Sequence, residues 1–333
     1  MDFVEFKKWH KKLSDCSHLV IAGPCSAESE AQVMTTAYEI SAIERVRVFR
    51  AGIWKPRTSP SDFEGVGELA LEWLKKVQTK TELLTCVEVA TPEHVEKCLK
   101  WGVDIFWLGA RTVANPFSVQ AIADALKGVD IPILIKNPVN PDLKLWIGAI
   151  ERVYNAGIRK IGAVHRGFYP FEEIRFRNIP KWEIPIELKT IFSDIPLLCD
   201  PSHIAGKRKY LHEVASYALC LNVDGLMIET HIDPQNALSD VAQQITPVEL
   251  KNLLAKLVFR KKDFENNEII SELQKLRLQI DSLDMQMIEL LAKRMKIVEK
   301  IGEYKNEKNI SIFQLERWKE IRDTRTVSYT HLR

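Results

Sequence analysis

Short apolar runs alternate with longer amphipathic stretches from residue 18 to about residue 258. Each run is rich in Val, Ile and Leu, which is typical of a buried strand, and the stretches between them are long enough for helices. Eight such units within about 240 residues predict a (β/α)8 barrel. A doubly wound open sheet is the alternative, but no GxGxxG follows the first run. The predicted strands are residues 18–23, 46–52, 82–89, 104–110, 131–137, 159–165, 195–200 and 223–229.

The pattern changes after the last predicted barrel helix, which we expect to begin with Thr246 as its cap and Pro247 as its first residue. The barrel then occupies residues 1–258, and the charged residues 259–268 form a linker. Residues 311–326 favour a further helix, and 327–333 continue no pattern. Between the linker and residues 311–326, apolar residues spaced mostly three or four apart predict a long helix: Leu273, Leu276, Ile280, Leu283, Met287, Leu290, Met295, Val298 and Ile301.

Composition narrows the class of protein. The chain has 333 residues, 46% of them hydrophobic and 28% charged, as in globular proteins. A net charge of +2 argues against a nucleic-acid binder. The amino end lacks the apolar core of a signal peptide, and no run reaches the roughly 18 apolar residues of a membrane span, so we expect a cytoplasmic protein. Its six cysteines form no CxxC pair, and reduced thiols are expected.

Polar residues stand just past each predicted strand. In a (β/α)8 barrel the carboxyl ends of the strands form one rim, from which catalytic side chains project. A single residue of this kind is an ordinary loop charge, but every strand supplies one, which favours a shared site. The positions are Cys25, Arg50, Lys55, Glu88, Arg111, Lys136, Arg166, His203 and Glu229.

Cations dominate this rim. Their mutual repulsion and desolvation would destabilise the fold unless anions neutralise them, so the expected ligand is polyanionic. The planar guanidinium of arginine suits phosphate and carboxylate oxygens. The six expected cations are Arg50, Lys55, Arg57, Arg111, Lys136 and Arg166.

A second set of rim residues combines a thiol, an imidazole and two carboxylates: Cys25, His203, Glu229 and Asp240. That mixture suits a divalent transition metal. Asp240 follows Glu229 by eleven residues, in a loop that can turn back over the rim. Taken singly, Cys25 is better explained as a buried small residue, and His203 as a loop histidine.

Seven motifs occur in one order between residues 18 and 258: "AGPCSAES", "FRAGIWKPRTSP", "LGAR", "IKN", "HRG", "DPSH" and "GLMIETHIDPQNALSD". Together they resemble 3-deoxy-D-arabino-heptulosonate 7-phosphate (DAHP) synthases of the short type I class. The resemblance implies condensation of phosphoenolpyruvate with erythrose 4-phosphate and water, the first step of the shikimate pathway. It also implies a divalent metal, often manganese, held by Cys25, His203, Glu229 and Asp240.

The same resemblance assigns the substrates. The phosphate of erythrose 4-phosphate is implied at Lys55, Pro56, Arg57 and Thr58, on a loop that two prolines stiffen. We expect Lys55 to act as a proton donor, with its pKa lowered by the surrounding arginines, and Cys25 and His203 to act through the metal. Phosphoenolpyruvate is implied at Arg50, Lys55, Arg111, Lys136 and Arg166.

The alternative within the superfamily is 3-deoxy-octulosonate 8-phosphate synthase, which shares the barrel and the phosphoenolpyruvate residues. Its corresponding loop typically reads KANRS, whereas this chain has "KPRTS", which favours the four-carbon sugar phosphate. A metal-dependent hydrolase on the same fold would not need six cations.

Residues 269–326 resemble the all-helical chorismate mutases, through "LRLQIDSLDMQMIELLAKRMKIVEKIGEYK" followed by "ER". Arg294 and Lys305 lie eleven residues apart, about three helical turns, and so share a helix face. Arg277 lies roughly 100° away, which suits the intertwined dimer of that family. The implied chorismate-binding residues are Arg277, Arg294, Lys305, Gln314 and Arg317.

Two departures from the mutase pattern change the expectation. Gln314 stands where the family often has an acidic residue, and the third helix of the family is missing. We therefore expect an incomplete mutase domain with weak or no activity in this chain, and a bifunctional full-length parent. The alternative is that the helices serve only for dimerisation and as a chorismate or prephenate sensor. A homodimer or larger assembly is expected in either case.

Overall fold

The computed structural model describes residues 1–55, 61–170, 175–259 and 267–329. The chain forms two compact units, residues 1–260 and 261–333. Pro56, Arg57 and Thr58, which the sequence predicts to bind erythrose 4-phosphate, lie outside the described residues. The end of the predicted tail, residues 330–333, also lies outside them.

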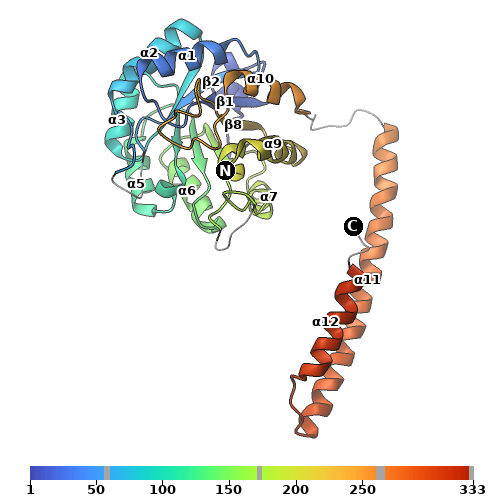
Figure 1. Ribbon diagram of the computed structural model, residues 1–333. Helices are drawn as coiled ribbons and strands as arrows, with labels where there is room; N and C mark the ends of the chain where they lie inside the picture. The colour runs from blue at the N-terminus through green and yellow to red at the C-terminus, as the bar shows by residue number, and fades with distance from the viewer. Residues whose placement is uncertain (56–60, 171–174, 260–266, 330–333) are drawn as a thin grey trace. The chain divides into compact units, whose positions relative to one another are not determined.

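Eight parallel strands form a closed barrel in which each strand pairs with the next and the last pairs with the first. Figure 1 shows the ring of strands inside a layer of helices. The closed ring confirms the predicted (β/α)8 barrel and excludes the open sheet. The strands are β1 (Leu19–Gly23), β2 (Val46–Ala51), β3 (Leu84–Glu88), β4 (Ile105–Leu108), β5 (Ile133–Lys136), β6 (Ile161–His165), β7 (Leu197–Cys199) and β8 (Gly225–Glu229).

Six helices of the barrel (α1, α3, α5, α6, α8 and α10) begin at a polar residue whose side chain caps the helix. Thr246 and Glu249 form a capping box at α10, with Pro247 in its first turn, as predicted. Asp200 caps the short helix α8 that carries His203. The helices are α1 (Glu30–Ser41), α2 (Leu69–Thr81), α3 (Pro92–Trp101), α4 (Ala110–Val113), α5 (Pro116–Ala125), α6 (Leu143–Asn155), α7 (Glu183–Ile191), α8 (Pro201–Ala205), α9 (Leu211–Cys220) and α10 (Pro247–Lys256).

Side chains alternate along each strand between the barrel interior and the helix layer. On β4, Trp107 points into the interior core, while Phe106 belongs to the outer core between strands and helices. The last inward residues of β2, β5 and β8 are charged instead of apolar: Arg50, Lys136 and Glu229 are all buried. The barrel is therefore apolar through its middle and ionic at its carboxyl rim.

The amino end closes the opposite opening of the barrel. Two 3-10 turns, η1 (Phe6–Lys8) and η2 (Lys11–Leu13), bring Phe6, Trp9 and Leu13 into the interior core. Trp9 lies so close to β6 that a Cβ on Gly162 would stand 2.9 Å from its ring. This N-terminal plug (Phe6, Trp9 and Leu13) completes the core beneath the rim.

The second unit consists of α11 (Asn267–Glu307) and α12 (Leu315–Tyr329), joined by a turn. Both helices were predicted, although α12 continues to Tyr329 and so includes the first three residues of the tail that showed no pattern. Among its described side chains, residues 272–324, none is buried. The large apolar side chains of α11 therefore have little cover within this unit.

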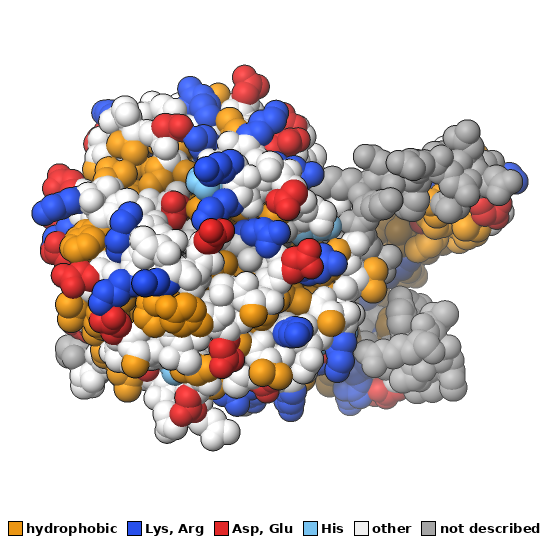
Figure 2. Space-filling model, turned by 90° about the horizontal axis from the view of Figure 1, so that it is seen from above, with side chains coloured by type: hydrophobic (Ala, Val, Ile, Leu, Met, Phe, Trp, Pro, Cys, Tyr) orange, Lys and Arg blue, Asp and Glu red, His pale blue; other side chains and the backbone are white. Residues whose placement is uncertain are grey.

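The surface of the barrel carries charges of both signs. On the face drawn in Figure 2, lysine and arginine side chains are interspersed with aspartate and glutamate, and no single charge covers a broad area. None of the helices in the described part of the chain combines the length and the apolar character that crossing a membrane requires.

Candidate active site and metal centre

A cavity of about 240 Å3 lies at the carboxyl rim of the barrel. Its position agrees with the rule that barrel enzymes bind substrate at this end. Most of the rim residues predicted from the sequence line it, and Arg177 and Asn178 join them from the segment before α7. The charged and polar lining residues are Lys55, Glu88, Arg111, Lys136, Arg166, Arg177, Asn178, His203 and Asp240.

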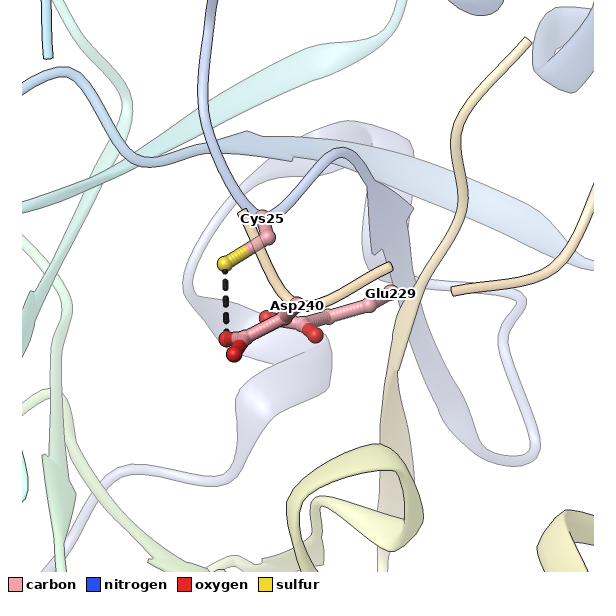
Figure 3. Close-up of side chains that lie close together, drawn as sticks. All are labelled: Cys25, Glu229 and Asp240. Carbon is pink, nitrogen blue, oxygen red and sulfur yellow. Dashed lines mark hydrogen bonds between the residues drawn. The ribbon is translucent and has the colours of Figure 1, made fainter. Parts of the chain in front are cut away.

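Three of the four predicted metal ligands come together beside this cavity. The Sγ of Cys25 and carboxylate oxygens of Glu229 and Asp240 all lie within 4.8 Å of one another. Figure 3 shows the thiol directed at the carboxylate of Asp240, and the Sγ to Oδ2 distance is 3.0 Å. Cys25 follows β1, Glu229 ends β8 and Asp240 lies in the next loop, so pairing of β1 with β8 produces the group.

The fourth predicted ligand, His203, lies at the edge of this group. Its Nδ1 is 2.8 Å from Oδ2 of Asp200, while its Nε2 is 3.7 Å from Oε1 of Glu229. Burial lowers the pKa of His203, more than the nearby carboxylates raise it. A neutral imidazole that donates Nδ1–H to a carboxylate presents its Nε2 lone pair to a metal, an arrangement common around metal-binding histidines.

The donor set fits a divalent cation. Burial and then the charge of Glu229 raise the pKa of the Cys25 thiol to about 12. The pKa values of Glu229 and Asp240 are both lowered, so two ionised carboxylates lie close together beside a protonated thiol. A divalent cation at this point would relieve their repulsion and release the thiol proton. One sulfur, one imidazole nitrogen and carboxylate oxygens are ligands that a transition metal accepts.

The rim cations are partly neutralised by acids of the protein itself, which the sequence analysis did not foresee. Arg50 pairs with Glu229 at 3.2 Å and with Asp200 at 3.9 Å, and Lys136 lies 2.8 Å from Asp200. Six described cations (Arg50, Lys55, Arg111, Lys136, Arg166 and Arg177) still outnumber the four carboxylates around the cavity (Glu88, Asp200, Glu229 and Asp240). The excess positive charge leaves the cavity suited to an anion.

Two arginines show where an anion is needed. Arg50 is 1% exposed, and within the described residues its Nε and Nη1 have no hydrogen-bond partner. Burial lowers the pKa of Arg166 to about 10, because the charge of Asp200 offsets it only in part. Buried donors without acceptors destabilise a fold, as does a buried charge that is only partly compensated, so both side chains favour an anionic ligand.

Lys55 lies against the metal group, which consists of Cys25, Glu229 and Asp240. The prediction that the pKa of Lys55 would be lowered is wrong. Its Nζ is 2.7 Å from Sγ of Cys25 and 3.1 Å from the Cys25 carbonyl oxygen. Burial alone would lower the pKa of Lys55, but the acidic groups Cys25, Glu229 and Glu88 outweigh burial and raise it. None of the surrounding arginines is among the largest influences on this pKa.

The loop that carries Lys55 is anchored at its base. The Trp54 ring stacks on His94 of α3, with centroids 3.8 Å apart and planes 4° from parallel. The Lys55 amide donates to the Glu64 carbonyl at 2.8 Å, so the two ends of the loop meet. This anchoring holds the base of the loop and so places Lys55 beside Cys25.

Sequence reasoning missed several residues of the site, among them Asp200, Arg177 and Gln243. Asp200 is fully buried and links Arg50, Lys136 and His203; it follows the seventh apolar run and could have been found by the same rim rule. Arg177 and Gln243 bind the carboxylates of the metal group. No strand ends at either, so the sequence held no comparable signal for them.

In the helical unit the predicted chorismate-binding residues lie apart from one another. Lys305 and Gln314 line one cavity of about 330 Å3, together with apolar residues such as Ile301 and Tyr304. The Lys305 ammonium donates to the Ile312 carbonyl at 2.9 Å. Arg277 and Arg294 lie elsewhere on α11, and Arg317 lies on α12. The described residues of one chain do not bring the five side chains into one pocket.

Comparisons with known proteins agree with both units. Residues 11–266 match the family described as the DAHP synthetase I family, and residues 276–329 match chorismate mutase type II. A phospho-2-dehydro-3-deoxyheptonate aldolase of Thermotoga maritima is 31% identical over 246 residues, covering 74% of this chain and 70% of that protein. A 2-dehydro-3-deoxyphosphooctonate aldolase of Desulfatibacillum aliphaticivorans is 29% identical over 265 residues, covering 72% of this chain and 90% of that protein.

Solved structures give the same result. The crystal structure of the Thermotoga maritima DAHP synthase aligns with a TM-score of 0.64 at 30% identity, covering 72% of this chain and 68% of that one. A truncated form of a DAHP synthase from the same organism aligns with a TM-score of 0.61 at 27% identity, covering 72% and 84%. The barrel, the rim cavity and the family match agree, and the chain belongs to the DAHP synthetase I family, with a chorismate mutase type II segment after its barrel.

Proposed function

We propose that this chain is a metal-dependent cytoplasmic DAHP synthase, which condenses phosphoenolpyruvate with erythrose 4-phosphate and water. A carbon–carbon bond forms between C3 of phosphoenolpyruvate and the aldehyde carbon. Water adds its oxygen at C2, the C2–O bond to phosphate breaks, and a proton reaches the former aldehyde oxygen. The observation that carries the proposal is the convergence of Cys25, Glu229 and Asp240 beside a cavity lined with cations.

Phosphoenolpyruvate takes up the excess positive charge at the rim. Arg111, Lys136 and Arg166 line the cavity, and Arg50 offers buried donors without hydrogen-bond partners. Carboxylate and phosphate groups are the anions that guanidinium groups bind bidentately. These contacts hold the enol phosphate with a fixed orientation, so that much of the entropic barrier to condensation is met on binding.

A divalent metal, which we assign as Mn2+, is held by Cys25, His203, Glu229 and Asp240. When bound, it supplies Lewis-acid polarisation of the aldehyde oxygen. The residues of the chain prepare this centre: Asp200 fixes the imidazole of His203 through Nδ1, and the buried carboxylates remain ionised.

Lys55 is the proposed proton donor to the aldehyde oxygen. Because its pKa is raised, the ammonium stays charged at neutral pH and keeps a proton to give. Its Nζ lies beside the thiol of Cys25, so the proton donor and the metal group would act on the same aldehyde oxygen. The phosphate of erythrose 4-phosphate is assigned to the loop of Pro56, Arg57 and Thr58 through the family resemblance.

The octonate synthase remains the alternative for the sugar substrate. Relatives named for both substrates match this chain, but the heptonate relative has the higher identity and the KPRTS loop favours the four-carbon aldehyde. We therefore assign erythrose 4-phosphate.

We further propose that residues 269–326 form a mutase-type unit that pairs with a second copy of the chain, joined to the barrel of residues 1–258 by a linker. The exposed apolar side chains of α11 support this, because Leu283, Met287 and Leu290 are each more than half exposed in one chain. A partner helix would cover them and could bring Arg277 of one chain towards Lys305 of the other. Rearrangement of chorismate to prephenate would require that assembly.

One assay tests both proposals. Phosphoenolpyruvate consumption is measured with erythrose 4-phosphate and Mn2+, with and without chelator, while chorismate loss is followed in the same preparation. Chelator-sensitive condensation supports the synthase, and its absence overturns it. Loss of chorismate would show that the mutase unit is active in this chain, whereas no loss agrees with the incomplete mutase domain expected from the sequence. Arabinose 5-phosphate in place of erythrose 4-phosphate tests the octonate alternative.

A further inference from the structure

Each carboxylate of the metal group (Asp240 and Glu229) uses its two oxygens differently. The inner oxygen lies towards Cys25 or His203, and the outer oxygen accepts a hydrogen bond from Arg177 or Gln243. Oδ2 of Asp240 is 3.0 Å from Sγ of Cys25, whereas Oδ1 accepts a hydrogen bond from Arg177 Nη1 at 2.9 Å. Oε1 of Glu229 faces His203 Nε2 and Arg50, whereas Oε2 accepts from Gln243 Nε2 at 2.5 Å. The outer oxygens are thus occupied by protein donors.

Arg177 and Gln243 also contact each other. Nη1 of Arg177 donates to the side-chain Oε1 of Gln243 at 2.6 Å. The backbone amide of Gln243 donates to the Asp240 carbonyl at 3.2 Å. We call this pair the Arg177–Gln243 bracket. It joins the outer oxygens of both carboxylates through one continuous set of hydrogen bonds.

The hydrogen bonds fix how the side-chain amide of Gln243 is oriented. A guanidinium only donates and a carboxylate only accepts, so the amide oxygen must face Arg177 and the amide nitrogen must face Glu229. The reversed amide would set donor against donor and acceptor against acceptor. Gln243 is 2% exposed, so water cannot replace either partner easily.

The backbone holds Arg177 in place for this contact. Its amide donates to the Ala205 carbonyl at 3.4 Å, and the next amide, of Asn178, donates to Ile204 at 3.2 Å. Gly206 allows the approach: its φ is +66°, and a Cβ there would stand 2.3 Å from the Cβ of Arg177. Arg177 is therefore attached to α8, the helix that carries His203.

Asp240 needs support of this kind. Its φ of 50° lies in the left-handed region, which a residue with a side chain adopts at a cost in free energy. The guanidinium contact with Oδ1 and the amide contact with the Asp240 carbonyl hold this conformation. Without them the carboxylate would be free to turn away from Cys25.

We propose that Arg177 and Gln243 are positioning residues of the metal centre. They occupy the outer oxygens of Asp240 and Glu229, so that each carboxylate presents its other oxygen to the thiol and the imidazole. The inference rests on the metal site proposed above. Loss of outer partners of metal ligands typically weakens binding 10- to 100-fold, and the bracket serves two ligands at once.

Binding of Co2+ without substrates tests the bracket directly. The probe is the thiolate-to-cobalt absorption band, which reports Cys25 ligation and does not depend on turnover. We expect Arg177→Met and Gln243→Leu each to raise the Co2+ dissociation constant about 10-fold. Arg177→Lys, which keeps the charge but not the two-acceptor contact, should fall between wild type and Arg177→Met.

The double variant separates a bracket from two independent contacts. Because Arg177 acts partly through Gln243, the combined loss should be smaller than the product of the single losses. Arg175→Met is the matched control: Arg175 lies two residues earlier and pairs with Glu213 on the surface, so its Co2+ affinity should stay within about twofold of wild type. Thermal melting of each metal-free variant confirms folding, and Arg177→Lys serves if another variant does not fold.

The outcomes distinguish this inference from the proposed function. Wild-type affinities and bands in Arg177→Met and Gln243→Leu overturn the bracket and leave the metal centre intact. Absence of any cobalt band in the wild type overturns the metal centre, and the bracket with it. A role for Arg177 in substrate binding alone would raise the KM for phosphoenolpyruvate without changing the Co2+ dissociation constant, which also overturns the inference.

Discussion

The barrel and the helical unit differ in how far they bury their large apolar side chains. Inside the barrel, large side chains such as Trp107 and Trp9 are at most 4% exposed, although neither is part of a long helix. On α11, Met287 and Leu290 are 61% and 64% exposed. The barrel covers its apolar surface with elements of its own chain, whereas α11 needs another surface to do so.

The charged residues of the two regions differ in the same way. Arg50, Lys136 and Glu229 are buried and paired at the rim, so their geometry is set before any substrate arrives. The arginines of α11 and α12 lie on exposed helices, and Arg317 pairs with Glu320, one turn along the same helix. A site inside one folded unit is preorganised, while a site on exposed helices is assembled by association.

The largest expected effect tests whether the barrel site is complete. Lys55→Met should lower turnover about 10^3-fold, because a positioned proton donor contributes in that range. Phosphoenolpyruvate affinity should change only a few-fold, since Arg50, Arg111, Lys136 and Arg166 remain. Steady-state kinetics and equilibrium titration with phosphoenolpyruvate measure the two quantities. Lys209→Met, on the exposed surface, is the control; an equal loss of turnover and affinity in Lys55→Met contradicts the donor role.

The second prediction concerns association of the helical unit. Met287→Lys should weaken dimerisation about 100-fold, because it places an unpaired charge in the centre of the proposed interface in both copies. Glu289→Lys lies about 200° around the helix from Met287 and should leave the dimer unchanged. Sedimentation equilibrium measures both, and condensation by the barrel should persist in each. Equal dissociation constants for the two variants would mean that this face of α11 is not the interface.

The third prediction is a pH dependence of metal binding that only the barrel should show. The pKa of Cys25 is raised to about 12, so the thiol is protonated at neutral pH and must lose one proton when the metal binds. The carboxylates and His203 have lowered pKa values and release none above pH 7. Apparent Co2+ affinity should therefore rise about tenfold per pH unit between pH 7 and 8. A slope near zero would contradict the neutral thiol.

The smallest effect concerns stability alone. His165 of β6 is buried between the strands and the outer helices, and burial lowers its pKa to about 3. The unfolded chain binds a proton there below about pH 6.5 and the folded chain does not, so stability falls as pH falls through 6.5. Wild type should lose about 2 kcal/mol more than His165→Phe between pH 7 and pH 5 in urea unfolding. Equal losses would show that His165 is protonated in the folded barrel.

Most of the fold could be predicted because its elements depend on local pattern. Eight apolar runs separated by helical stretches leave few arrangements, and each predicted run contains a strand of the barrel. The N-terminal plug was not predicted. Phe6, Trp9 and Leu13 form two short turns without helical or strand periodicity, so only the open end of the barrel explains them.

The residues of the site also differ in whether the sequence could predict them. Residues at strand ends, such as Cys25, Lys136 and Glu229, could be found because the barrel places those ends together. Arg177 and Gln243 could not, since their positions depend on loop contacts. The expected pKa of Lys55 was wrong because the charges that influence it most are acids supplied by other strands, and distance along the sequence does not reveal them.

The pairing of β1 with β8 has a consequence for how the protein is made. Cys25 and Asp240 stand 215 positions apart, and they meet only where the first strand contacts the last. While the chain emerges from the ribosome, the thiol is present early, but both carboxylates arrive near the end of the barrel. A nascent or broken barrel therefore cannot bind the ion at the proposed centre, and metal uptake marks the moment at which the ring of strands has closed.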